Sequence, residues 1–168
     1  AEGRRLPIVE CVEIGLILVE ALEFLHQHGL THRDIKPSNI IFVNGRPKLA
    51  DVGLVAEIRP PDEVTTWAGT VGYMPPPPEP PGTVQADLYA LGMVLYVIST
   101  GRDPTLFPDL PTTLIERTGH PAFIRLNAII LDACQPDCAR RYKSAVTMRA
   151  ALQEAQKMLG SNVTPPRE

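Results

Sequence analysis

The feature that most constrains the fold is an Asn-Gly dipeptide at residues 44–45, between two short strand-like segments. Residues 40–43 before it are all apolar, and residues 48–50 read as the returning strand. An Asn-Gly pair in this setting is the strongest short-range signal for a β-hairpin, because both residues accept the positive φ of a tight turn. The hairpin joins two polar loops, one ending at Asn39 and one beginning at Asp51. We therefore expect these two loops to meet at one end of the hairpin.

Outside this hairpin, apolar residues recur mostly at helical spacing. The predicted helices cover residues 8–28, 83–100, 112–117, 122–134 and 144–159. Gly29 and Gly101 stand where the first two of these helices should end, and Ser144 and Thr147 are candidate caps for the last. We therefore predict an α+β fold that is mostly α-helical, in which buried helices support one small hairpin and its polar loops.

The composition fits one globular domain without a membrane segment. The chain has 168 residues and a formal net charge of -3, which provides no basic surface for nucleic acid. The apolar stretch at residues 14–25 is interrupted by Glu20 and Glu23, so it predicts an amphipathic helix rather than a membrane span. The three cysteines are interpreted as reduced thiols. We expect a cytoplasmic chain, and any membrane anchor of the parent protein would lie elsewhere.

The most informative segment for chemistry is His-Arg-Asp-Ile-Lys-Pro-Ser-Asn at residues 32–39. Asp34 and Lys36 are spaced to face a common anionic substrate. Asn39 and Asp51, brought together by the hairpin, offer an amide oxygen and a carboxylate, which suit magnesium. Asp34 then remains available as a base or orienting group, and Lys36 neutralises phosphate charge.

The order of these groups resembles the signature of protein kinases. That signature runs His-Arg-Asp, four residues, Asn, then Asp-x-Gly, then Pro-Glu, which is found here at residues 78–79. Lys at the second position after Asp34, followed by Pro, resembles the serine/threonine kinases. The resemblance implies that residues 1–159 form a kinase C-terminal lobe, an incomplete kinase domain, and that residues 160–168 are a flexible tail.

The resemblance also implies a role for each site residue. Asp34 is expected to accept or orient the proton of the substrate hydroxyl, and Lys36 to contact the transferred phosphate of ATP. Asn39 and Asp51 are expected to hold Mg²⁺. Thr70, in a Gly-Thr-Val-Gly-Tyr segment, is expected to contact Asp34 and Lys36. From the residues alone the alternatives stay open: Asp34 and Asn39 can cap turns, and Thr70 can be a turn threonine.

Three structural contacts follow from the same resemblance. His32 is expected to pack inward and to hydrogen-bond the backbone. Asp87, which lies in an otherwise apolar helix, is expected to bind the backbone of the catalytic loop, residues 32–39, near His32 and Arg33. Glu79 is expected to pair with Arg141. By contrast, the sequence predicts that His26 and His28 face solvent or cap the end of the first helix.

A regulatory contact is also implied. Arg33 resembles the family arginine that contacts a phosphate on the activation segment, the stretch between Asp51 and Glu79. Thr65 or Thr66 in this stretch is therefore a candidate phosphorylation site. The alternative for Arg33 is a hydrogen bond to a backbone carbonyl.

Two departures from the family pattern stand near the site. Val52 occupies a position where Phe is usual, which leaves less apolar bulk beside the metal-binding Asp. The four prolines at residues 75–78 include two more than the family usually has before Glu79. They are expected to extend or reshape the substrate-docking loop.

The sequence lacks the other half of a kinase site. It contains no Gly-x-Gly-x-x-Gly loop and no Val-Ala-Ile-Lys strand before the first predicted helix. We expect the parent to be an ATP-dependent serine/threonine kinase that acts on protein hydroxyls, and this chain to be inactive without the missing N-terminal lobe. The alternatives are a non-catalytic, pseudokinase-like binding module and, less favoured, an unrelated helical magnesium-dependent hydrolase.

Overall fold

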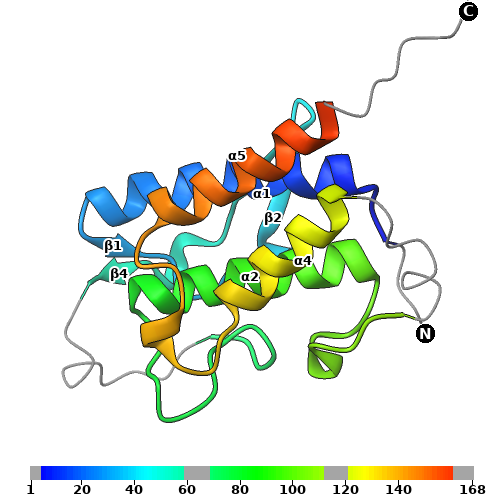
Figure 1. Cartoon of the computed structure of the whole chain (residues 1–168). Coiled ribbons are helices and arrows are strands. Elements are labelled where there is room, and N and C mark those ends of the chain that lie inside the picture. The colour runs from blue at the N-terminus through cyan, green and yellow to red at the C-terminus, as the bar shows by residue number, and fades with distance from the viewer. Residues whose placement is uncertain (1–4, 59–68, 112–120, 161–168) are drawn as a thin grey trace, which may run out of the picture.

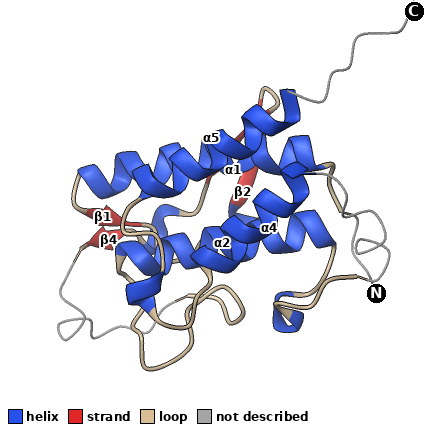
Figure 2. Ribbon diagram, viewed as in Figure 1, coloured by secondary structure: helices blue, strands red, loops and turns tan. Residues whose placement is uncertain are grey.

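The computed structural model describes residues 5–58, 69–111 and 121–160. Helices account for most of this part of the chain, and strands occur only in two short ribbons (Figure 2). The elements are α1 Ile8–Gln27, β1 Leu30–Thr31, β2 Ile40–Val43, β3 Arg46–Leu49, β4 Ala56–Glu57, α2 Val84–Thr100, α4 Pro121–Ala133 and α5 Ala145–Gly160. The mostly helical α+β class predicted from the sequence is confirmed. The helix predicted at residues 112–117 lies outside the described residues. So does the tail predicted at residues 160–168, except for Gly160, which is the last residue of α5.

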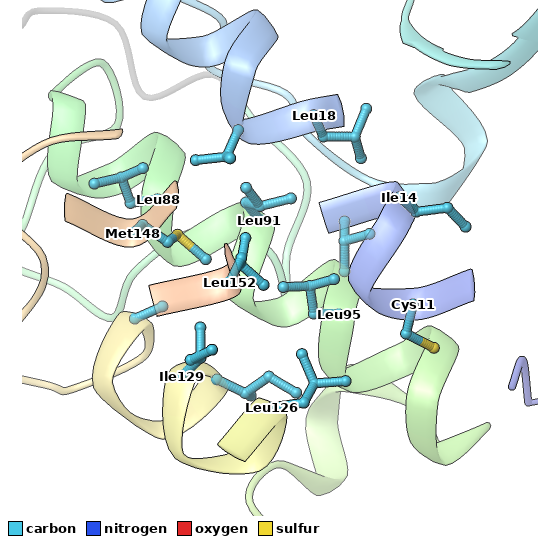
Figure 3. Packing of buried hydrophobic residues seen from close by; sticks show 14 of the residues in the cluster. Cys11, Ile14, Leu18, Leu88, Leu91, Leu95, Leu126, Ile129, Met148 and Leu152 are labelled. Carbon is cyan, nitrogen blue, oxygen red and sulfur yellow. The ribbon is translucent and has the colours of Figure 1, made fainter. Parts of the chain in front are cut away.

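The core lies where the helices meet. Helix α1 packs against α5 and α2, and α4 packs against the same two helices from the other side (Figure 1). Leucines from all four helices meet in this space and are fully buried (Figure 3): Leu18, Leu91, Leu126 and Leu152. Each such side chain contributes about 1.5–3 kcal/mol when it leaves water. Helix α2 is therefore held on several sides and forms a rigid base for the loops.

The ends of the helices follow the local signals in the sequence. The Thr83 hydroxyl accepts a hydrogen bond from the Ala86 N–H at 3.0 Å, which caps the start of α2. At the start of α5, the backbone N–H of Thr147 donates to the Ser144 hydroxyl oxygen at 3.3 Å, and the Ser144 N–H donates to Thr147 Oγ1 at 3.3 Å. The predicted caps of α5 are therefore confirmed.

The hairpin forms at the predicted turn. Strands β2 and β3 are antiparallel, with Val43 opposite Arg46. Asn44 and Gly45 between them have φ values of 51° and 76°, as a two-residue primed turn requires. The returning strand begins at Arg46 rather than at residue 48, because the turn takes only two residues.

A second ribbon was not predicted. Strand β1 pairs antiparallel with β4, with Thr31 opposite Ala56. Each strand has only two residues, too few to show an alternating pattern. The ribbon ties the start of the catalytic loop to the segment that follows Asp51. No helix among the described residues has the length and hydropathy needed to cross a bilayer.

A buried ion pair anchors the loop that precedes α2. Arg141, whose side chain is fully buried, donates from Nη1 to Glu79 Oε1 at 2.8 Å, and its Nη2 lies 2.7 Å from Oε2. Arg141 Nε also donates to the carbonyl oxygen of Gln135 at 2.7 Å. The guanidinium lies 4.9 Å from the ring centre of Tyr89 on α2. These contacts fasten the end of the proline-rich loop to the segment between α4 and α5.

We predict that Arg141→Met lowers the free energy of unfolding by about 3–5 kcal/mol, because it leaves a largely buried carboxylate without its partner. The control is Arg125→Met. Arg125 pairs with Glu154 at 2.6 Å, but both side chains are partly exposed, so its loss should cost about 0–1 kcal/mol. Urea unfolding of both variants measures the difference, and equal losses would contradict the prediction.

Gly92 provides a second test of the packing. A Cβ at this position would lie 2.7 Å from Cys134 Sγ and 2.8 Å from Ala133 Cβ, so α2 approaches α4 closely only without a side chain here. We predict that Gly92→Ala destabilises the fold by about 1–3 kcal/mol through overpacking. Gly160→Ala, which has open space around it, should be neutral or slightly stabilising in the same thermal unfolding assay. A neutral Gly92→Ala would show that the contact is loose.

Candidate active site

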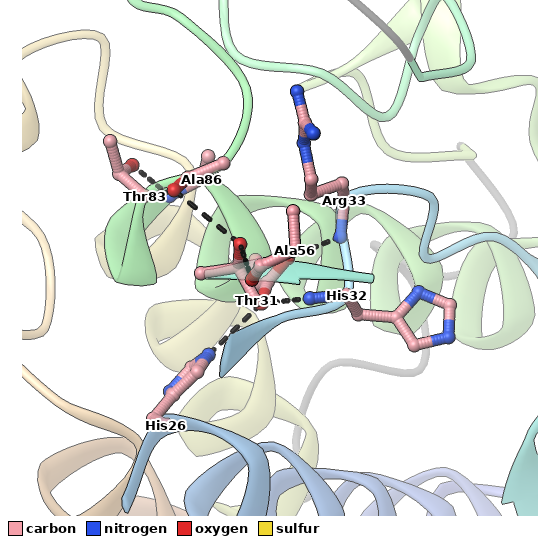
Figure 4. A network of polar contacts seen from close by, with 9 residues as sticks. His26, Thr31, His32, Arg33, Ala56, Thr83 and Ala86 are labelled. Atoms are coloured by element: carbon pink, nitrogen blue, oxygen red, sulfur yellow. Dashed lines mark hydrogen bonds and ion pairs between the residues drawn. The ribbon is translucent and has the colours of Figure 1, made fainter. Parts of the chain in front are cut away.

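The backbone of the catalytic loop is held by the carboxylate of Asp87 on α2. Asp87 Oδ2 accepts the backbone N–H of His32 at 2.9 Å, and Oδ1 accepts that of Arg33 at 2.9 Å. The Asp87 side chain is only 1% exposed. Arg33 has a φ of 73°, a left-handed conformation that is uncommon for a non-glycine residue. The two bonds therefore fix a strained backbone directly before Asp34, as Figure 4 shows for the N–H groups of His32 and Arg33.

His32 links the two polar loops. Its ring is buried, and its Nε2 lies 3.2 Å from the carbonyl oxygen of Ala50. Because a carbonyl only accepts, Nε2 carries the proton in this bond. Ala50 immediately precedes Asp51, and its own N–H donates to the Asn39 carbonyl at 2.8 Å. Asn39 and Asp51 therefore leave the same end of the hairpin, as the sequence predicts.

Four predicted side chains interact directly. Asp34 Oδ1 accepts a hydrogen bond from the Thr70 hydroxyl at 2.7 Å. Asp34 Oδ2 lies 2.9 Å from Lys36 Nζ and accepts from Asn39 Nδ2 at 3.0 Å. Lys36 Nζ also donates to Thr70 Oγ1 at 2.8 Å. The cluster joins three residues of the catalytic loop to Thr70 of a distant segment.

The charge state of Asp34 follows from these contacts. Burial alone would raise the pKa of its carboxyl group, but the hydrogen bonds from Thr70, Lys36 and Asn39 and the charge of Lys36 outweigh it. The net result is a pKa below the ordinary value for aspartate. Asp34 is therefore an anion at neutral pH, able to accept a hydrogen bond from a further hydroxyl.

The two expected metal ligands have the right donor atoms. Asn39 Nδ2 donates to both the carboxylate and the backbone carbonyl of Asp34. The amide oxygen of Asn39 therefore points away from Asp34. Asp51 is exposed and has a φ of 58°. An amide oxygen and a carboxylate oxygen at one end of a hairpin fit Mg²⁺, which prefers oxygen ligands.

Several predictions near the site are left open. Thr65 and Thr66 lie outside the described residues, as does the side chain of Val52. The Arg33 side chain packs over Gly82, where an added Cβ would lie 3.2 Å from Arg33 Nε. Its expected contact with a phosphate stays a prediction.

The proline run forms an irregular loop that leads to Glu79. Together with residues 136–138, Pro76, Pro77 and Pro78 border a groove of about 470 Å³. The expected effect of the two additional prolines on substrate docking stays a prediction.

One sequence prediction is wrong. His26 was expected to face solvent or to cap the helix end, but its side chain is only 9% exposed and its Nε2 lies 3.0 Å from Asp87 Oδ2. The helical period contained the signal, because His26 follows the buried Leu22 by four residues and so lies on the same face of α1. His28 is exposed, and its Nδ1 lies 2.7 Å from the carbonyl oxygen of Phe24, as expected for a group at the helix end.

Comparison with known proteins gives a consistent assignment. Residues 3–148 match the protein kinase domain family. Serine/threonine-protein kinase PknB of Mycobacterium leprae is 32% identical over 164 residues, which cover 88% of this chain and 26% of that protein. PknB of Mycolicibacterium smegmatis is 35% identical over 159 residues, which cover 84% of this chain and 25% of that protein. PknB of Mycobacterium tuberculosis is 33% identical over an alignment of 169 positions, which covers 90% of this chain and 27% of that protein.

The chain thus spans about a quarter of the length of these curated relatives. Its family match, by contrast, includes the catalytic loop, the hairpin, α2 and the ion pair between Glu79 and Arg141. The chain belongs to the protein kinase family.

Proposed function

We propose that the protein containing this chain is a serine/threonine kinase that transfers the γ-phosphate of ATP to hydroxyl groups of protein substrates. The observation that carries the proposal is the contact cluster around Asp34, in which Lys36, Asn39 and Thr70 all bind one carboxylate. Phosphoryl transfer needs mainly positioning and charge stabilisation. A fixed anion beside a fixed ammonium group supplies both.

Each residue of the cluster has a distinct task in this proposal. The ionised Asp34 accepts a hydrogen bond from the substrate hydroxyl and orients its oxygen toward the phosphate. The Thr70 hydroxyl makes a bond of this kind to Oδ1 at 2.7 Å, so the carboxylate accepts from a hydroxyl group in this setting. Lys36 Nζ, 2.9 Å from Asp34 Oδ2, offsets negative charge on the transferred phosphate. Thr70 fixes Asp34 and Lys36 relative to one another.

Asn39 and Asp51 would hold Mg²⁺ through their oxygen atoms. When bound, the metal offsets the charge of the ATP phosphates. The sequence has no Gly-x-Gly-x-x-Gly loop to cover those phosphates, so we infer that an N-terminal lobe of the parent completes the nucleotide site. Without it, this chain should transfer little phosphate. The cytoplasmic location expected from the sequence stays a prediction.

The second candidate is a non-catalytic binding module. A complete set of contacts around Asp34 favours the enzyme over this module, since a binding role needs no ionised aspartate at this position. The gene sequence directly upstream distinguishes the two. An encoded strand Lys and helix Glu would support the kinase, and a true start codon at this point would support the module.

We predict that Asp34→Ala in the parent protein lowers the turnover number for phosphorylation of a Ser/Thr peptide by about 10²- to 10⁴-fold, the usual contribution of a positioned acid–base group. The matched control is Asp132→Ala, which removes an exposed aspartate from α4 and should leave turnover unchanged. Transfer of ³²P from ATP measures both. Equal activity of Asp34→Ala and wild type would refute the assigned role.

Asp34 should also make stability depend on pH. Its pKa is lowered in the folded state, so ionised Asp34 stabilises the fold above its unfolded pKa of about 3.9. That contribution is lost as the pH falls through the lowered folded-state pKa. We therefore predict that wild type is more stable than Asp34→Asn at pH 6 and that the gap shrinks toward pH 3. Urea unfolding at constant ionic strength measures this difference in the free energy of unfolding. A difference that widens on acidification would contradict the lowered folded-state pKa of Asp34.

A further inference from the structure

The proline-rich loop that precedes α2 borders two different spaces. Its two ends, Pro75 and Pro81, line a small space of about 10 Å³ that Asp34 and Thr70 also line. Its middle, residues 76–80, borders the groove of about 470 Å³, which we call the proline groove. The border of the proline groove is completed by residues 83, 85 and 136–138. One loop therefore connects the proline groove to the surroundings of Asp34.

A single buried guanidinium holds both walls of the proline groove. Arg141 Nη2 lies 2.7 Å from Glu79 Oε2 on one wall and donates to the carbonyl oxygen of Pro136 on the other wall at 3.2 Å. Figure 1 shows the segment between α4 and α5, in orange, beside the start of α2, in green. Because both walls are bonded to one fixed group, the groove is formed before a ligand binds. Its volume lies in the range of about 300–1,000 Å³ that is usual for ligand sites.

The walls of the proline groove are apolar and poor in hydrogen-bond donors. Five prolines border it, at positions 76, 77, 78, 80 and 136. Proline has no backbone N–H, and the N–H of Glu79 among them is already bonded to the Pro76 carbonyl at 3.4 Å. These walls offer ring carbons and carbonyl oxygens. They suit a ligand that has an apolar stem and brings its own hydrogen-bond donors.

One carboxylate gives the proline groove its charge. Asp137 is exposed, and its Oδ1 accepts the backbone N–H of Ala139 at 2.9 Å, which orients the carboxylate. The charge of Glu79 is offset by Arg141, whereas no ion pair is recorded for Asp137 in the described segments. None of the described residues that border the groove is basic apart from this floor, and Arg140, three positions along, does not border it. A lysine or arginine side chain fits this setting, because its methylene stem packs on apolar surface while its charged head reaches a carboxylate.

We propose that the proline groove is a docking site for a segment of the protein substrate that bears lysine or arginine, separate from the segment that carries the phosphorylated hydroxyl. This inference rests on the proposed kinase function. The four prolines at residues 75–78, two more than the family usually has, supply most of one wall. Docking holds the substrate near Asp34 without entering the transfer step, so it should lower KM and leave kcat unchanged.

The binding test uses the full-length parent protein with Asp34→Ala, so that no turnover accompanies binding. The probe is a fluorescent peptide without hydroxyl groups in which arginines alternate with leucines, and the comparison peptide has glutamates in place of the arginines. We expect only the arginine peptide to bind, as measured by fluorescence anisotropy. No binding, or equal binding of the glutamate peptide, would overturn the proposal.

Variants of Asp137 locate the recognised charge. Asp137→Asn keeps an acceptor for the Ala139 N–H and should weaken binding of the arginine peptide by about two- to fivefold, as for a partly exposed ion pair. Asp137→Lys should weaken it by at least about tenfold, because it opposes like charges. The controls Asp132→Asn and Asp132→Lys make the same charge changes on the exposed face of α4 and should leave the affinity unchanged. Equal losses at positions 132 and 137 would show a general charge effect and would overturn the proposal.

Cys138 reports the place of binding without any need for activity. Its thiol is free and exposed and borders the proline groove. Saturating arginine peptide should therefore slow alkylation of Cys138 by iodoacetamide at least about threefold, because the rate depends on access to the thiol. Mass spectrometry of the proteolytic fragment that contains residue 138 measures this rate. An unchanged rate would show that the peptide binds elsewhere and would overturn the proposal.

The kinetic test asks whether the occupant is the substrate. In the active parent, a serine peptide joined to the arginine segment should have a KM at least about fivefold lower than the serine peptide alone, at the best of three glycine-rich linkers of about 5, 10 and 20 residues. The kcat should stay within about twofold. The ratio of the two KM values should fall toward one in Asp137→Lys and persist in Asp132→Lys. A ratio near one in wild type would overturn the proposal and assign the groove to another basic partner.

Failure of the proposed function gives a different result. If wild type transfers no more phosphate than Asp34→Ala, the kinase proposal fails, and with it the role of the groove in substrate docking. The anisotropy and alkylation measurements then still decide whether the proline groove recognises a basic segment.

Discussion

A buried carboxylate, that of Asp87, is the contact on which the geometry of the candidate site depends. A charge removed from water is very unfavourable unless it is paired or hydrogen-bonded, and here the donors are two backbone N–H groups of the catalytic loop and His26. The observed conformation of the loop therefore offsets the cost of burying Asp87 on α2. Since α2 packs against α1, α4 and α5, the stability of the helical core is coupled to the shape of the loop.

The hairpin performs the complementary task of bringing separate loops together. Its two-residue turn sets the register, and that register places Asn39 beside Ala50 and hence near Asp51. Thr70 arrives from a third segment, whose tight turn is closed by a hydrogen bond from the Tyr73 N–H to the Thr70 carbonyl at 3.0 Å. A side chain at Gly69 would force Met74 to move, because its Cβ would lie 2.5 Å from Met74 Sδ. Each loop is therefore placed by a different local constraint.

Much of this arrangement was predictable because its signals are local. The helix ends at Thr83, Ser144 and Gly101 and the turn at residues 44–45 each depend on the chemistry of a few neighbouring residues. The ribbon of β1 and β4 was missed because a two-residue strand has no period. His26 was assigned wrongly because its partner, Asp87, lies 61 positions away. No local rule states that a histidine at a helix end will meet a buried aspartate, although its helical phase places it on the core side.

The hydrogen bonds to Asp34 also indicate how a substrate would approach under the proposed function. Each carboxylate oxygen can accept about two hydrogen bonds. Oδ2 already accepts from Lys36 and Asn39, whereas Oδ1 accepts only from Thr70 among the contacts recorded in the described segments. The remaining acceptor position is therefore on Oδ1, alongside the Thr70 hydroxyl, where a substrate hydroxyl would bind under the proposed function. That approach leaves the Lys36 contact on Oδ2 intact, so the ammonium group can stay next to the aspartate while the hydroxyl binds. In this arrangement the substrate hydroxyl would bind Oδ1 of the carboxylate, and the ammonium group of Lys36 would stay on Oδ2.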